Sequence, residues 1–189
     1  MEDIILVGFG GHAKSIADCI ERKNEYRIVG YTDMEEIDTK YRYLGTDEVL
    51  QEYFDNGVKN AVVCVGYLGK GSLRNKLYDN LKKIGYRLPV IADPSAIISN
   101  TAIIEEGVFI GKQAIINADA RVGKMAIINT RALIEHECVV GDFTHIAVGA
   151  VLCGQVKVGQ DVLVGANSTI IQCRKIEDNK IVPAGVTIR

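Results

Sequence analysis

The chain has 189 residues, of which 48% are hydrophobic, and its formal net charge is −2. This length allows one large or two small domains, and the composition excludes a disordered or fibrous protein. The near-neutral charge, without runs of like charge, gives no reason to expect nucleic acid or an anionic membrane as a partner.

The N-terminus and the cysteines predict a cytoplasmic protein. Residues 1–3 carry no basic side chain, and the apolar stretch 4–7 is too short for a signal peptide or a membrane span. The five cysteines are widely spaced and form no Cys-x-x-Cys pair. We therefore expect no disulfide framework and no zinc motif.

The chain begins with the pattern of a strand, a glycine-rich turn and a helix. We predict the strand at residues 3–7 and the helix at 15–22, with Gly10, Gly11 and His12 in the turn. Glycines let a backbone approach a phosphate, and the free amides of a helix N-terminus favour an anion. The Gly-x-Gly-x-x-Ala spacing matches the dinucleotide fingerprint only loosely, so a plain βα turn without a ligand is the alternative.

Further elements complete a small parallel α/β domain. A strand at 26–31 leads to Asp33, whose carboxylate could accept hydrogen bonds from a ribose or a base. A strand at 60–65 and an amphipathic helix at 73–84 follow. Ninety residues are too few for a complete NAD domain, so we expect a Rossmann-like domain at 1–90 that binds a mononucleotide, with a hinge at 88–94.

A six-residue repeat fills the rest of the chain. Stepping by six from Ala92 to Val182 meets Ile, Leu or Val at fifteen of sixteen positions, and a second column four residues further on is mostly small. Glycine often follows the aliphatic residue, where we expect it to help the backbone turn a corner. The period fits neither an amphipathic helix nor an alternating strand, but it fits a hexapeptide β-helix. We place this domain at 91–189.

An alternative fold for the repeat, and the hand of the β-helix, remain to be considered. An antiparallel β-sandwich would show strands and turn signals without a fixed six-residue register, so we set it aside. The hand of the β-helix does not follow from physics, because parallel crossovers are almost always right-handed.

Two histidines lie in the repeat outside its aliphatic column. Acyl transfer from a thioester needs a base, and an imidazole titrates near the working pH, so His136 is the candidate, with Glu137 as the carboxylate that orients it. Coils of roughly 18 residues would stack Gly154 beside His136, where its N–H could hold the thioester oxygen. A surface histidine without a role is the alternative. Zinc catalysis ordinarily needs three protein ligands, and two histidines are too few.

As a set, these motifs resemble the NeuD/PglD group of bacterial sugar acyltransferases over essentially the whole chain. The motifs are residues 8–14, 93–96, 127–130, 135–142 and 145–150. The resemblance implies a left-handed β-helix, a cytoplasmic homotrimer and acetyl-CoA in the groove between adjacent β-helices. It makes His136 the base and Glu137 its partner. It also implies a nucleotide-sugar site and an acetyl-CoA site, at Gly10, Gly11, His12 and Asp33 and at Asn129, His145, Gly154 and Ala166.

Three hypotheses follow for the activity. The first is an acetyl-CoA-dependent N-acetyltransferase that acts directly on a nucleotide-linked amino sugar of the UDP-4-amino-4,6-dideoxy type in glycan biosynthesis, without a metal. The second is a sugar O-acetyltransferase of the sialic acid type. The third is a non-catalytic binding protein, because relatives usually continue through a further coil, whereas this sequence loses its small column at Arg174 and Lys180; we expect a shortened CoA groove there.

Overall fold

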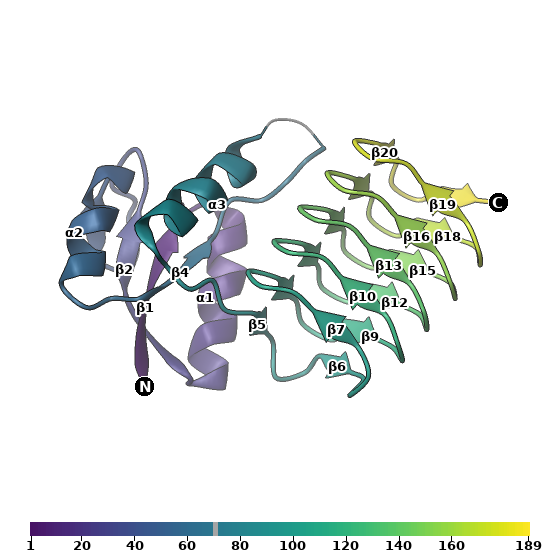
Figure 1. The fold of residues 1–189 in the computed structure, drawn as a ribbon, viewed down its shortest axis with the longest axis horizontal. Coiled ribbons are helices and arrows are strands. Elements are labelled where there is room, and N and C mark those ends of the chain that lie inside the picture. Colours follow the sequence, from purple (N-terminus) through teal and green to yellow (C-terminus); the bar gives the residue numbers. More distant parts are fainter. Residues whose placement is uncertain (70–71) are drawn as a thin grey trace. The chain divides into compact units, whose positions relative to one another are not determined.

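The computed structural model describes residues 1–69 and 72–189, which form two compact units (Figure 1). The first unit comprises Met1–Gly66 and Ser72–Pro89. The second comprises Val90–Arg189 together with the described residues 67–69, which the sequence had assigned to the first domain. Among the described residues, no helix is both long and apolar enough to cross a membrane.

The first unit is an α/β domain with a four-stranded parallel sheet, as predicted. Its strands lie in the order β3-β2-β1-β4 and all pair in parallel. In chain order its elements are β1 (Glu2–Val7), α1 (Gly11–Lys23), β2 (Tyr26–Thr32), β3 (Tyr43–Gly45), η1 (Asp47–Val49), α2 (Leu50–Asp55), β4 (Asn60–Val63) and α3 (Leu73–Ile84). The buried residues of β1 and α1 form much of the core of this unit.

The strand order creates a topological switch point in this unit. The chain leaves β1 through α1 to β2 on one side, and it returns through α2 to β4 on the other. Because such crossovers are right-handed, α1 and α2 cover opposite faces, and the carboxyl ends of β1 and β4 separate at a switch point where α/β domains bind ligands. Gly8–Gly11 follows β1 at this point.

Sequence patterns missed the middle of this unit. β3 has only three residues, and η1 and α2 are short, so none of them shows a full period of hydrophobic residues. Tertiary contacts stabilise them instead. The Tyr86 hydroxyl donates a 2.8 Å hydrogen bond to the Leu50 carbonyl, and both side chains are buried.

The second unit is a left-handed parallel β-helix built from two-residue strands. Its coils pass in turn through three flat faces, which we name A, B and C in chain order (Figure 1). Face A contains β5 (Ile91–Ala92), β8 (Phe109–Ile110), β11 (Ile127–Ile128), β14 (His145–Ile146), β17 (Leu163–Val164) and β20 (Ile181–Val182). Face B contains β6 (Ile97–Ile98), β9 (Ile115–Ile116), β12 (Leu133–Ile134), β15 (Val151–Leu152), β18 (Thr169–Ile170) and β21 (Thr187–Ile188). Face C contains β7 (Ile103–Ile104), β10 (Arg121–Val122), β13 (Val139–Val140), β16 (Lys157–Val158) and β19 (Lys175–Ile176).

The predicted columns form the core of the β-helix. Ile110, Ile128 and Ile146 are aligned in register on face A, and each side chain is fully buried. The small column is buried from Val108 to Ser168. Burial of each such aliphatic side chain stabilises the fold by about 1.5–3 kcal/mol, so the repeat alone supplies a continuous core.

The role of the corner glycines differs from the prediction. Gly111, Gly141 and their equivalents do not have positive φ angles, so a permissive backbone does not explain them. The positive φ angles lie at the third residue of a corner, for example at Glu137 (φ 59°). A Cβ on Gly141 would instead lie 2.5 Å from the carbonyl carbon of Gly159 in the next coil. These positions need glycine because successive coils approach closely.

The expected hinge at 88–94 is also wrong in part. β5 lies inside it and pairs with β8, so the β-helix already begins at Ile91. The prolines at 89 and 94 flank this two-residue strand, and Asp93 is buried with its Oδ1 accepting hydrogen bonds from the N–H and hydroxyl of Ser95.

Candidate active site

His136 lies on the corner between faces B and C. β12 ends at Ile134 and β13 begins at Val139, so the intervening corner projects the imidazole outward, and the side chain is 53% exposed. The Glu135 carboxylate accepts the His136 N–H at 3.1 Å and an N–H from Asn117 of the preceding coil at 3.1 Å. Bonds to neighbouring coils therefore fix the backbone that carries the imidazole.

Glu137 contacts the imidazole directly. Its Oε2 lies 3.1 Å from His136 Nδ1 and accepts a 3.0 Å hydrogen bond from Gln155 Nε2. The hydrogen bond from Gln155, followed by that from His136, lowers the pKa of the Glu137 carboxyl. An ionised carboxylate only accepts, so this contact puts the ring proton on Nδ1 and leaves Nε2 free to take a proton.

The imidazole of His136 lies over Gly154 of the next coil, as the 18-residue spacing predicted. A Cβ at position 154 would come within 2.5 Å of His136 Nε2 and 2.6 Å of Cε1. None of the hydrogen bonds among the described residues uses the Gly154 N–H. The bare backbone thus makes room for the ring and offers a free donor beside it.

Cys138 follows this pair, but it is not an accessible nucleophile. Its side chain is buried, its thiol donates to the Cys153 carbonyl at 3.1 Å, and burial raises its pKa to about 11. A thiol that stays protonated is a poor nucleophile. Cys138 is therefore not suited to form a covalent acyl-enzyme.

His145 and Asn129 form a second cluster, on face A and on its corner with face B. The Asn129 Oδ1 accepts the Thr130 N–H at 2.8 Å, which turns its amide nitrogen toward His145 Nε2 at 3.1 Å. His145 Nδ1 lies 2.7 Å from the Tyr67 carbonyl oxygen. His145 is thus a neutral Nδ1–H tautomer with both nitrogens engaged and 8% exposure.

No sequence pattern indicated the contact between Tyr67 and His145. The Tyr67 hydroxyl donates to the Asp161 carbonyl at 2.8 Å, and a Cβ on Gly69 would meet the side chain of Ile181. The described residues 67–69, which we call the strap, therefore lie against face A. No repeat or motif marks this segment, because its contacts are made with residues far away in the sequence.

The acetyl-CoA residues implied by the resemblance fall on two different corners. Ala166 lies with Asn129 on the corner between faces A and B, whereas Gly154 lies with His136 on the corner between faces B and C. Face B separates the two corners within one chain. A single chain does not bring these residues together.

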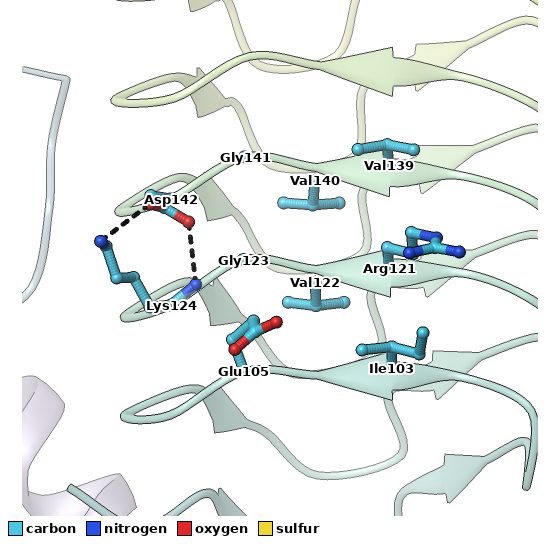
Figure 2. A pocket seen from close by; sticks show the side chains of 10 residues that line it. All are labelled: Ile103, Glu105, Arg121, Val122, Gly123, Lys124, Val139, Val140, Gly141 and Asp142. Carbon is cyan, nitrogen blue, oxygen red and sulfur yellow. Dashed lines mark hydrogen bonds and ion pairs between the residues drawn. The ribbon is translucent and has the colours of Figure 1, made fainter.

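A groove runs along face C next to the His136 corner (Figure 2). Aliphatic side chains of Ile103 and Val139 form its floor, and the exposed Arg121 lies between them. At the far corner, Asp142 binds the Lys124 N–H at 3.0 Å and its ammonium group at 3.4 Å. The groove begins at β13, which directly follows the corner that carries His136.

The residues predicted for the nucleotide-sugar gather at the switch point of the first unit. Asp33 accepts the Phe9 N–H at Oδ2 and the Met34 N–H at Oδ1, both at 2.7 Å, so its carboxylate holds the glycine turn. No atom lies within 4 Å of a Cβ placed on Gly10 or Gly11. His12 follows them in the first turn of α1 and lies beside Gly66, whose added Cβ would be 3.8 Å from that of His12.

Two further observations concern the chemistry of the described residues. No group of three His, Cys, Asp or Glu side chains within residues 1–69 and 72–189 could hold a metal ion. Helix α1 has no acidic residue in its first turn and no side-chain cap at Gly10. No side chain of the first turn therefore opposes the preference of a helix N-terminus for an anion.

Two family models match the chain, one in each unit. The model of the PglD N-terminal domain matches residues 3–81, and that of the hexapeptide repeat of succinyl-transferase matches residues 155–189.

Solved structures match the whole chain. A histidine-to-alanine variant of GDP-perosamine N-acetyltransferase from Caulobacter crescentus, in complex with CoA and GDP-perosamine, is 27% identical, with a TM-score of 0.93 over 100% of this chain and 89% of that chain. The acetyltransferase domain of PglB from Neisseria gonorrhoeae is 26% identical, with a TM-score of 0.92 over 100% and 92%. PerB from Caulobacter crescentus, also with CoA and GDP-perosamine, is 25% identical, with a TM-score of 0.71 over 100% and 92%.

The fold and these matches identify the chain as an acyltransferase of the hexapeptide-repeat class. Its N-terminal domain matches the model of the PglD N-terminal domain, and its whole length is similar in structure to the acetyltransferases named above. The predicted resemblance is confirmed.

Proposed function

We propose that this enzyme transfers an acetyl group from acetyl-CoA to the amine of a nucleotide-linked sugar, with His136 as the general base. The observation that carries the proposal is the imidazole of His136, which is bonded through Nδ1 to Glu137 and lies over the bare backbone of Gly154. An imidazole with a free Nε2 beside an unused N–H has both parts that acyl transfer needs.

The roles of the residues follow from this geometry. The free Nε2 of His136 accepts a proton from the amine as its nitrogen attacks the thioester carbonyl, and the Gly154 N–H stabilises the negative charge on the carbonyl oxygen. Glu137 stabilises the imidazolium that forms. As the new C–N bond replaces the C–S bond, the imidazolium returns its proton to the departing thiolate. With Cys138 buried, the transfer is direct.

The first unit holds the nucleotide-sugar in this proposal. The space beside Gly10 and Gly11, which carry no side chains, suits a diphosphate at the N-terminus of α1, with His12 beside it and Asp33 near the ribose or base. The matched transferase from Caulobacter crescentus was solved with GDP-perosamine. That supports a nucleoside diphosphate sugar, while a UDP-linked 4-amino-4,6-dideoxy sugar is the particular acceptor expected from the sequence.

The protein acts as a cytoplasmic homotrimer in this proposal, with acetyl-CoA between neighbouring β-helices. Packing of β-helices side by side would bring Asn129, His145 and Ala166 of one copy toward His136 of another. The outward side chains of face B support such packing. Ile97, which is 65% exposed, and the half-buried Ile115, Leu133 and Val151 follow one another in a column along this face. An apolar column of this kind is typical of an interface.

Transfer to a hydroxyl is the second candidate. A base and a shaped pocket would serve either acceptor, but the matched structure is described as an N-acetyltransferase, which favours the amine. Amino and hydroxy forms of the same sugar, each linked to UDP and to GDP, should be incubated with acetyl-CoA and the products weighed by mass spectrometry. We expect a mass gain of about 42 Da, the mass that one acetyl group adds, on the amino forms alone.

The proposed base is tested by His136→Ala. We expect kcat/KM to fall by about 10²–10⁴-fold, because a positioned base contributes that much, while acetyl-CoA still binds. Steady-state kinetics and calorimetry measure the two effects. Full activity of the variant would refute the mechanism, and loss of acetyl-CoA binding would reassign His136 to that substrate.

A further inference from the structure

We propose that Gln155 is a positioning residue, which holds the Glu137 carboxylate in place and through it orients the imidazole of His136. The inference rests on the proposed role of His136 as a base. Gln155 was not among the residues that the sequence singled out, although it follows Glu137 by one coil.

The backbone and the side chain of Gln155 both contact this site. Its N–H donates to the His136 carbonyl at 2.9 Å, so the two coils are bonded at this point. Its Nε2 donates at 3.0 Å to Glu137 Oε2, the same oxygen that lies 3.1 Å from His136 Nδ1. Gln155, Glu137 and His136 are therefore joined through one carboxylate oxygen.

Cys173 fixes the orientation of the Gln155 amide. This residue lies one coil further along the same corner, and its thiol donates to Gln155 Oε1 at 3.3 Å. With the amide oxygen turned toward a donor, the amide nitrogen must face Glu137, and a carboxylate accepts from it without conflict. Side chains from three successive coils thus define the donor that Glu137 meets.

Glu137 needs this support because it is mobile by nature. Its side chain is 52% exposed, so burial does little to restrict its rotatable bonds. Without Gln155, the carboxylate would be held by the imidazole alone and could turn into solvent. The lowered pKa of Glu137, caused first by Gln155, is consistent with this role, since the bond favours the ionised form.

The test replaces Gln155 by methionine, which keeps the length of the side chain but removes its amide. We expect kcat to fall by about tenfold with little change in the KM of either substrate. Mutation of a residue that orients a functional side chain typically lowers activity by about 10–100-fold. In a Glu137→Ala background, the same change should have no further effect if Gln155 acts through Glu137. Equal losses in both backgrounds would overturn the proposal.

Gln160 provides a control. It is an exposed glutamine on the corner between faces C and A, which carries none of the predicted site residues, and its backbone is bonded to Asp178 and Asn179 of the next coil. Gln160→Met should leave kcat near the wild-type value. A similar loss in this variant would show that methionine at such corners damages the β-helix itself.

Nitrogen NMR of ¹⁵N-histidine protein tests the orientation without an activity assay. The wild type should show His136 mainly as the Nδ1–H tautomer, and Gln155→Met should raise the share of Nε2–H. An unchanged tautomer with unchanged kcat would refute the positioning role. If the wild type has this tautomer but transfers no acetyl group to any acceptor, the proposed function fails while the arrangement of Gln155 stands.

Discussion

At the scale of single residues, the site depends on the lack of a side chain at Gly154. Gly154 leaves the space that the imidazole of His136 occupies, because a Cβ at this position would lie 2.5 Å from His136 Nε2. His145, by contrast, has both nitrogens engaged, by Asn129 and by the Tyr67 carbonyl. Its position fits a role in holding the strap, while its predicted contact with acetyl-CoA stays a prediction.

The variant Gly154→Ala tests the importance of this space. The added methyl would lie 2.5 Å from His136 Nε2, so the ring must turn away, and a misplacement of about 1 Å can cost about 10²-fold in rate. We expect kcat to fall to that degree. The melting temperature should stay within a few degrees, because only a flexible side chain has to move. A variant with wild-type kcat would mean that the ring acts from another position.

At the scale of the elements, the corners decide how closely the coils stack. From Gln113 onward, the third residue of each corner has a positive φ angle, and its N–H bonds to the coil before it. Where the first corner residue is a glycine, as at Gly111, Gly141 and Gly165, an added Cβ would lie against the backbone of the coil after it. The corners therefore carry both the regularity of the β-helix and its active residues.

Gly141→Ala should destabilise the protein where Gly154→Ala does not. A Cβ at position 141 would lie 2.5 Å from backbone carbon and 2.6 Å from backbone nitrogen of the next coil. Backbone atoms cannot move aside separately, so we expect a loss of about 1–3 kcal/mol in the free energy of unfolding. Urea denaturation of the two alanine variants measures this difference. Equal stabilities would contradict close stacking as the reason for glycine.

At the scale of the whole molecule, the two corners of predicted acetyl-CoA residues call for a second copy of the chain. Face B lies between them and carries an apolar outward column. Both features fit the side-by-side packing of the proposed trimer.

Leu133→Glu tests this assembly. A carboxylate in the centre of the apolar column would have to be buried on association, which is unfavourable without a partner. Light scattering should give three times the chain mass of 20.6 kDa for the wild type and a lower mass, with lost activity, for the variant. Lys83→Glu, an exposed change of charge on α3, is the control and should keep the wild-type mass. A wild-type protein that is a monomer would exclude the trimer.

The sequence alone determined the β-helix and the place of its histidine pair. A six-residue period admits one register, so it fixed which side chains point inward, and the 18-residue coil put Gly154 beside His136. The glycine turn and its neighbouring strands were equally readable, because a strand, a turn and a helix follow one another locally.

Only the tertiary structure decided the rest. The strap on His145, the Gln155–Glu137 bond and the separation of the two corners each depend on which atoms meet across coils or across distant segments. Such contacts use backbone atoms and single polar side chains, which leave no period in the sequence. Periodicity records what must be buried, whereas a site depends on distances that only the folded chain sets.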